Sequence, residues 1–92
     1  MKKNWDEFLD LLLVCQDKKD LQTFFELFTT IEEREMLCAR YGIVKNLLQG
    51  NISQREISSN LKVSIAQITR GSNALKTINH LFKKKMLQHL DD

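Results

Sequence analysis

The chain has 92 residues, which is enough for one small domain. It has no proline and only three glycines, a shortage of turn-forming residues that excludes hairpin-based folds and predicts an all-α fold. Residues 1–50 carry 7 Lys and Arg against 9 Asp and Glu, whereas residues 51–92 carry 7 against 3. The basic second half favours a polyanionic partner, usually nucleic acid.

Three helices are predicted in the first half from the spacing of apolar residues. They span about Trp5–Asp17, Leu21–Phe28 and Ile31–Leu48. Asp20 is the expected N-cap of the second helix, and Thr30 with Glu33 forms a capping box for the third. Gly50 is suited to follow the end of the third helix. That helix carries one apolar stripe, made of Leu37, Tyr41, Val44 and Leu48.

Three more helices are predicted in the second half. They run from the capping box Ser53–Glu56 to about Asn60, from the capping box Ser64–Gln67 to about Thr77, and from His80 to Leu90 after Asn79. No apolar run approaches the ~20 residues that span a bilayer, so we expect no membrane partner. The two cysteines fit neither a disulfide scaffold nor a zinc site, so we expect the reducing cytoplasm.

The two short helices between Ser53 and Thr77 are separated by about three residues, which predicts a helix-turn-helix. Ile57, Leu61, Val63 and Ile68 are placed to hold them at a steep angle. An αα-corner that serves stability alone has the same spacing. The polar residues left over favour DNA binding, because they are rich in hydrogen-bond donors: Gln54, Arg55, Gln67, Thr69 and Arg70. Lys62 occupies a turn position that usually holds Gly, where a left-handed backbone would be strained by about 1 kcal/mol.

Other chemistry receives little support from the sequence. Cys15 and Cys38 form no CxxC pair, and the two histidines, His80 and His89, are too far apart in sequence to share a metal. We therefore expect no metal and two cysteines that act as small core hydrophobes. No nucleophile–base pair or carboxylate pair stands out, so we expect no enzyme.

Two segments, Ile52–Glu56 and Ser64–Lys76, resemble the tryptophan operon repressor family, and the run Ile68–Asn73 is highly specific for it. Glu33–Glu35 and Arg40–Gly50 align with the same family without a gap. The resemblance implies six short helices in a single domain that forms an intertwined homodimer. Residues 1–50 would form the dimerisation core, 53–77 the helix-turn-helix and 79–90 the C-terminal helix.

Apolar content supports the dimer independently of the resemblance, because six short helices in 92 residues cannot hide so many Phe and Leu in one core. The interlocking part is expected in the first three helices. Its apolar residues are Leu9, Leu12, Leu13, Phe24, Phe25, Phe28 and Leu37.

By resemblance, the protein would repress transcription with L-tryptophan as co-repressor. The indole would lie between Arg40 and Arg70, since guanidinium planes stack on aromatic faces. Arg70 and Thr30 would meet the carboxylate, and Gly71 would let the ligand approach the backbone. The ammonium would meet carbonyls of Leu27 and Thr29 from the other subunit. Surface roles for the two arginines, and a capping role alone for Thr30, remain alternatives.

The family places the fifth helix in the major groove of operator DNA. Arg55 is the candidate for a guanine contact and Lys76 for a phosphate contact. The other residues expected to face the bases are Gln54, Ile65, Ala66, Gln67 and Thr69. Ser58 stands where the best-known family pattern has Lys, and Gln67 where it has Thr, so we expect a related but different operator.

One departure lies in the expected ligand site. Ala74 stands where the family pattern has a Ser that helps hold the ammonium. A regulator that binds DNA constitutively, or one that responds to another small molecule, is therefore an alternative. A helical protein-interaction module whose basic face is only solvated is a third.

Overall fold

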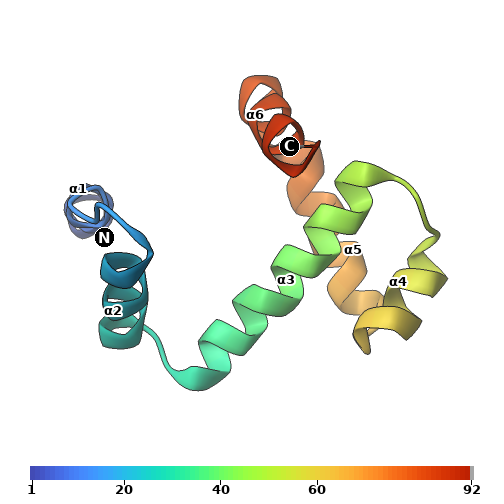
Figure 1. Ribbon diagram of the computed structural model, residues 1–92, viewed down its shortest axis with the longest axis horizontal. Coiled ribbons are helices and arrows are strands. Elements are labelled where there is room, and N and C mark those ends of the chain that lie inside the picture. Colours follow the sequence, from blue (N-terminus) through green and yellow to red (C-terminus); the bar gives the residue numbers. More distant parts are fainter. Residues whose placement is uncertain (92) are drawn as a thin grey trace. The chain divides into compact units, whose positions relative to one another are not determined.

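The computed structural model describes residues 1–91, and these form six α-helices without a strand (Figure 1). The helices are α1 (Lys2–Leu12), α2 (Lys18–Phe28), α3 (Ile31–Gln49), α4 (Gln54–Leu61), α5 (Ile65–Thr77) and α6 (His80–Asp91). The predicted all-α fold is confirmed. The chain divides into two compact units, Met1–Glu35 and Met36–Asp92, and each is described by itself.

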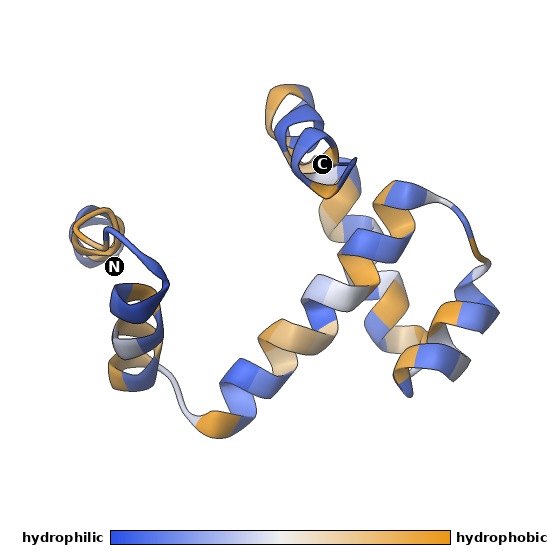
Figure 2. Ribbon diagram, viewed as in Figure 1, coloured by the Kyte–Doolittle hydropathy of each residue, from blue (hydrophilic) through white to orange (hydrophobic). Residues whose placement is uncertain are grey.

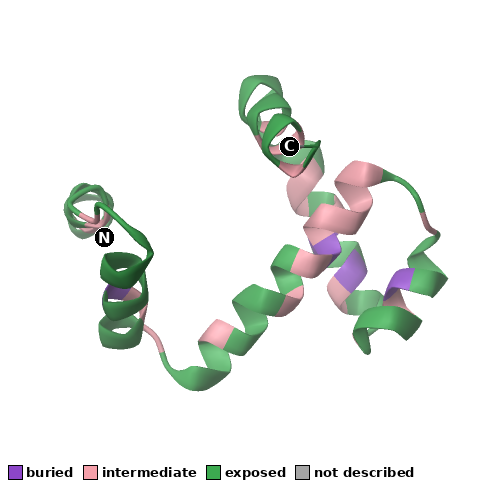
Figure 3. Ribbon diagram, in the orientation of Figure 1, coloured by how far each residue is buried: buried purple, intermediate pink, exposed green. Residues whose placement is uncertain are grey.

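The first unit is held together by aromatic rings of α1 and α2 that meet in tilted and edge-to-face arrangements. The ring of Phe8 lies 5.1 Å from that of Phe24 and 5.2 Å from that of Phe28, measured between centroids, and Trp5 stacks on Phe8 at 5.8 Å. Both helices mix apolar and polar residues (Figure 2), yet their surface is mostly exposed (Figure 3). Within residues 1–35, Phe24 alone is buried.

Three predicted helix boundaries in this unit are wrong. The first helix begins at Lys2 rather than near Trp5 and ends at Leu12 rather than near Asp17. The second begins at Lys18 rather than near Leu21. The N-cap of α2 is Asp17, whose carboxylate accepts a hydrogen bond from the Asp20 amide at 2.8 Å. Asp20 lies in the first turn, where its carboxylate accepts from the Gln16 amide at 3.0 Å. The two acids thus satisfy amides on both sides of the helix start.

The second unit is built around three isoleucines that are almost fully buried: Ile43 of α3, Ile57 of α4 and Ile68 of α5. Their buried segments are marked on the three helices in Figure 3. Leu47, Ile52 and Val63 pack against this cluster at its edge.

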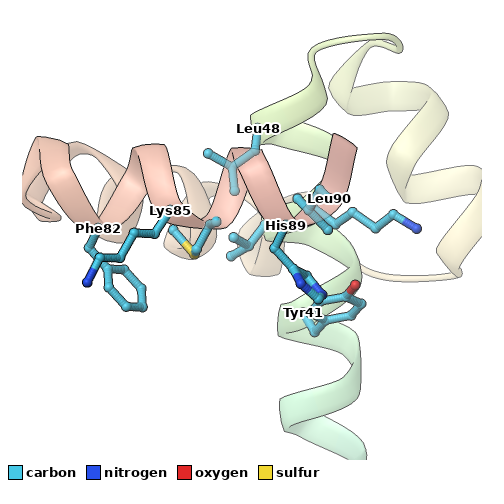
Figure 4. A pocket seen from close by; sticks show the side chains of 9 residues that line it. Tyr41, Leu48, Phe82, Lys85, His89 and Leu90 are labelled. Atoms are coloured by element: carbon cyan, nitrogen blue, oxygen red, sulfur yellow. The ribbon is translucent and has the colours of Figure 1, made fainter. Parts of the chain in front are cut away.

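The predicted apolar stripe of α3 does not face this cluster. Leu37 and Tyr41 are 51% and 58% exposed, whereas Ile43 is 1% exposed. Val44 and Leu48 instead line a largely apolar groove of about 280 Å³ between α3 and α6, together with Tyr41. Figure 4 shows this groove, which Phe82 and Leu90 border from α6. The helix α3 therefore offers one face to α4 and α5 and another to α6.

The remaining helix signals agree with the structure. Gly50 has φ +66° after α3, and Asn79 caps α6 by accepting from the Phe82 amide at 2.8 Å. Thr30 Oγ1 accepts from the Glu33 amide at 3.1 Å, and the Glu33 carboxylate accepts from the Thr30 amide at 2.8 Å. The predicted capping box at the start of α3 is therefore confirmed.

Candidate functional site

The helices α4 and α5 are joined by a turn of three residues, 62–64, and pack through Ile57 and Ile68. Val63 in the turn packs against the same cluster. Leu61, which was expected to help hold the two helices at a steep angle, is 37% exposed. It lies against Gly42 of α3, where an added Cβ would come 3.1 Å from Leu61 Cδ1. We call α4, the turn and α5 the two-helix unit.

Both helices of the two-helix unit start at a complete capping box, as predicted. Ser53 Oγ accepts from the Glu56 amide at 3.1 Å, and Glu56 Oε1 accepts from the Ser53 amide at 3.2 Å. Ser64 Oγ accepts from the Gln67 amide at 3.1 Å, and Gln67 Oε1 accepts from the Ser64 amide at 2.8 Å. Glu56 is the sole acid between residues 51 and 90, and its carboxylate is bound within the chain.

The turn between α4 and α5 has one strained backbone position, Lys62, and is stabilised by a side-chain hydrogen bond from Ser58. Lys62 has φ 56° and ψ 46°, so of the two possibilities left by the sequence, a left-handed backbone or a different turn, the structure shows the left-handed one. Ser58 Oγ donates to the Val63 carbonyl at 2.7 Å. The sequence suggested only that Ser58 removes a charge from the DNA-facing surface, whereas the structure gives it a bracing role in the turn.

The residues predicted to face DNA lie on the two-helix unit and most of them are exposed. The exposed ones are Gln54, Arg55, Ile65, Ala66, Thr69 and Lys76. Ile65, the first residue of α5, is 52% exposed. Gln67 differs from the others, because it is half-buried and its Oε1 is bound to the Ser64 amide.

The two predicted stacking arginines lie at one cavity. Arg40 of α3 and Arg70 of α5 border a space of about 60 Å³, together with Met36, Ile43 and Gln67. Both arginines are exposed as whole residues. The site thus combines two planar cations with two apolar side chains, which suits an aromatic group.

Gly71 explains why α5 lies so close to α3 at this cavity. A Cβ at Gly71 would come 2.8 Å from Ile43 Cγ2 and 3.7 Å from Arg40 Cδ. The sequence suggested that Gly71 makes room for a ligand. In this chain the adjacent space is filled by the Ile43 side chain, and Gly71 is buried.

The other predicted ligand residues belong to the first unit. Leu27 is 74% exposed, Thr29 is half-buried and Thr30 is exposed. The Thr30 hydroxyl oxygen accepts from the Glu33 amide, which leaves its hydrogen free to donate. One hydroxyl can therefore both cap α3 and donate to an anion.

Sequence reasoning missed a cation at the end of α2. Arg34 Nη1 donates to the carbonyls of Phe25 at 3.1 Å and Thr29 at 2.9 Å, and to Thr29 Oγ1 at 3.1 Å. Thr29 Oγ1 also donates to the Phe25 carbonyl. The carbonyls at this helix end therefore already hold one cation, that of Arg34. The predicted contact of a ligand ammonium with the Leu27 and Thr29 carbonyls stays a prediction. The sequence signal for this contact of Arg34 was an arginine near the start of α3 and only a few residues after the end of α2.

Within residues 1–91, no group of three or more His, Cys, Asp or Glu is placed to hold a metal. Cys15 is half-buried, but Cys38 is exposed, so its prediction as a core hydrophobe is wrong for the single chain. None of the helices described for this chain has the length and apolar character needed to cross a membrane.

Comparison with known proteins gives consistent results over most of the chain. A family described as Trp repressor protein matches residues 3–90. A Trp operon repressor homolog of Chlamydia trachomatis serovar D is 47% identical over 83 residues, which cover 90% of this chain and 88% of that protein. A Trp operon repressor homolog of Haemophilus influenzae (strain PittEE) is 42% identical over 89 residues, covering 97% of this chain and 88% of that protein.

Proposed function

The chain belongs to the Trp repressor protein family, which comprises DNA-binding transcriptional repressors, and on this premise we propose that it represses transcription in response to L-tryptophan. In this proposal it binds operator DNA in the cytoplasm as a homodimer, through the two-helix unit acting as a helix-turn-helix. The observation that carries the proposal is the position of Arg70. It borders the cavity with Arg40 and lies on α5, the helix that would read DNA.

The chemistry of the cavity supports an aromatic amino acid as ligand. The guanidinium groups of Arg40 and Arg70 can stack on the two faces of an indole, and Met36 and Ile43 supply apolar contact. The two arginines are donors suited to a carboxylate. Thr30 belongs to the first unit and does not line this cavity, and its free hydroxyl hydrogen is proposed as a further donor to the ligand. No metal is needed for this recognition.

The size of the cavity supports a site shared between two copies of the chain. Its volume of about 60 Å³ is far below the roughly 300–1,000 Å³ of typical small-molecule sites. A second copy can supply the remaining wall through Leu27 and the carbonyl of Thr29. Leu27 is 74% exposed in one chain, so burying it against an indole is favourable.

Exposed apolar surface supports the homodimer. The first unit has 35 residues and one buried side chain, Phe24, which is too small a core to fold alone. Large apolar side chains remain exposed in both units, a pattern that marks protein interfaces. Those more than half exposed include Trp5, Leu13, Val14, Leu27, Ile31, Met36, Leu37, Tyr41 and Leu81.

Ligand control follows if bound tryptophan fixes α5 against α3. In a symmetric dimer the two reading helices must match half-sites about 34–36 Å apart. Arg55 would contact guanine and Lys76 phosphate, while Gln54, Ile65, Ala66 and Thr69 would face the bases. The ligand increases DNA affinity only if it binds more tightly to the dimer with the matching separation than to the dimer with another separation.

The test selects duplexes from a random DNA library on the purified protein with L-tryptophan present, and then titrates the enriched duplex with and without L-tryptophan. We expect at least tenfold tighter binding with the ligand and a steep loss of affinity as salt rises. Equal affinity with and without L-tryptophan would refute the ligand dependence. Failure to enrich any duplex, with no salt dependence, would favour a protein-interaction module.

A different small molecule is the second candidate, and two observations favour it. Ala74 offers no side-chain acceptor for an ammonium group, and the Thr29 carbonyl already accepts from Arg34. Calorimetry with L-tryptophan and with indole-3-propionate, which lacks the amine, separates the two candidates. Tighter binding of indole-3-propionate would assign the site to an aromatic acid, and binding of neither would favour a constitutive regulator.

A further inference from the structure

Among the described residues, Gln67 alone both closes a capping box and lines the cavity at Arg40 and Arg70. Its Oε1 accepts from the Ser64 amide at 2.8 Å, so it closes the capping box at the start of α5. The residue also lines the cavity that Arg40 and Arg70 border. The residue is half-buried, which limits the directions in which the side chain can turn.

The turn before α5 depends on this contact. Lys62 is held in the left-handed region, and the Val63 carbonyl is fixed from α4 by Ser58 at 2.7 Å. The next amide, that of Ser64, is fixed from α5 by Gln67. Of the two bracing side chains, Gln67 alone borders the cavity.

We propose that Gln67 is a positioning residue that couples occupancy of the Arg40–Arg70 cavity to the order of the turn at the start of α5. The inference rests on the function proposed above and adds the route by which the ligand acts on the reading helix. A group that enters the cavity contacts the Gln67 side chain and restricts its rotamers. The Ser64 hydrogen bond requires one of those rotamers, so the bound ligand removes part of the entropy that opposes the bond.

The capping box of α4 provides an internal control. Glu56 Oε1 accepts from the Ser53 amide at 3.2 Å, in the same local geometry, but Glu56 does not line the cavity. A ligand that merely stabilises the whole protein protects both amides, whereas coupling through Gln67 protects the Ser64 amide selectively.

The experiment measures amide hydrogen exchange of the full-length wild-type protein by NMR, with and without saturating L-tryptophan, after calorimetry of the same sample. We expect L-tryptophan to slow exchange of the Ser64 amide at least tenfold and that of the Ser53 amide less than twofold. Equal slowing of both amides, or of neither while calorimetry records binding, would overturn the inference alone. Absence of binding in calorimetry would overturn the proposed ligand and this inference together.

Matched variants test the coupling on DNA. Gln67→Met keeps the length of the side chain but removes the acceptor for Ser64, and Glu56→Met makes the same change at α4. We expect Gln67→Met to reduce the ratio of operator affinities with and without L-tryptophan at least fivefold. Glu56→Met should leave this ratio within twofold of wild type, even if operator affinity itself falls. An unchanged ratio in Gln67→Met, or an equal reduction in both variants, would contradict the coupling.

Discussion

The close approach of α3 and α5 predicts a specific effect for Gly71→Ala. The new methyl group would lie 2.8 Å from Ile43 Cγ2, well inside ordinary van der Waals contact. Ile43 is 1% exposed and is packed against Ile57 and Ile68, so it cannot turn away. The helices must separate instead.

The expected cost follows from two opposing effects. Overpacking of a filled core costs about 1–3 kcal/mol, and the upper part of this range applies because Ile43 is enclosed. Alanine gains about 1 kcal/mol over glycine in a helix. We therefore expect the free energy of unfolding to fall by about 1–2 kcal/mol, which lowers the melting temperature by about 5–15 °C. Because Arg40 Cδ lies 3.7 Å from the new Cβ, we also expect about tenfold weaker binding of L-tryptophan.

Thermal unfolding at a fixed protein concentration and calorimetry with L-tryptophan are the assays. Gly50→Ala is the control, because Gly50 has φ +66° and nothing within 4 Å of an added Cβ. It should cost about 1–2 kcal/mol through backbone strain and leave ligand affinity unchanged. Adding Ile43→Leu, which lacks the branched Cγ2, should recover part of the stability lost in Gly71→Ala. Wild-type stability together with wild-type ligand affinity in Gly71→Ala would refute the packing argument.

Four further substitutions test the site and the turn. Arg70→Leu should abolish L-tryptophan-dependent operator binding while size-exclusion chromatography still shows a dimer, and an unchanged tryptophan response would count against the cavity. Lys62→Gly should raise the free energy of unfolding by about 1 kcal/mol in chemical denaturation, because glycine adopts φ 56° without strain, so no gain would contradict the strain. Ser58→Ala should lower it by about 1 kcal/mol as the Val63 carbonyl loses its donor, and a neutral result would mean that water replaces the hydroxyl. Arg34→Met should lower the melting temperature by removing the charged donor from the last carbonyls of α2, at a cost of about 2 kcal/mol, and an unchanged melting temperature would show that this contact is dispensable.

Local signals in the sequence predicted local structure well. The capping boxes at Thr30, Ser53 and Ser64 all form, because the partners are three residues apart and need no tertiary contact. The end of the first helix was predicted wrongly because that prediction used an apolar pattern, whose meaning depends on non-local contacts. Leu13 and Val14 continue the apolar pattern, but they are 82% and 67% exposed and lie beyond the helix. An apolar pattern reports where burial is needed, and such burial need not occur within one chain.

The candidate site could not be assembled from spacing alone. Arg40 and Arg70 are 30 residues apart in sequence, and they meet because Gly71 lets α5 lie against Ile43. Their pairing was expected only from the family resemblance. Gln67 was assigned to DNA by the same resemblance, whereas its bond to Ser64 follows from the capping-box pattern and its place in the cavity from tertiary packing.

The partly exposed α3 connects the proposed dimer to the proposed ligand site. Its Ile43 face is filled by α4 and α5, while Tyr41 on its other side remains 58% exposed beside the groove against α6. In the proposed dimer, a second copy that covers such apolar surface would also supply its own Leu27 and Thr29, the two residues that the small cavity lacks in the proposed site. The same association would then bury the apolar side chains and complete the ligand site. In this proposal tryptophan affinity is a property of the dimer, and a variant that remains monomeric should lose it even with Arg40 and Arg70 intact.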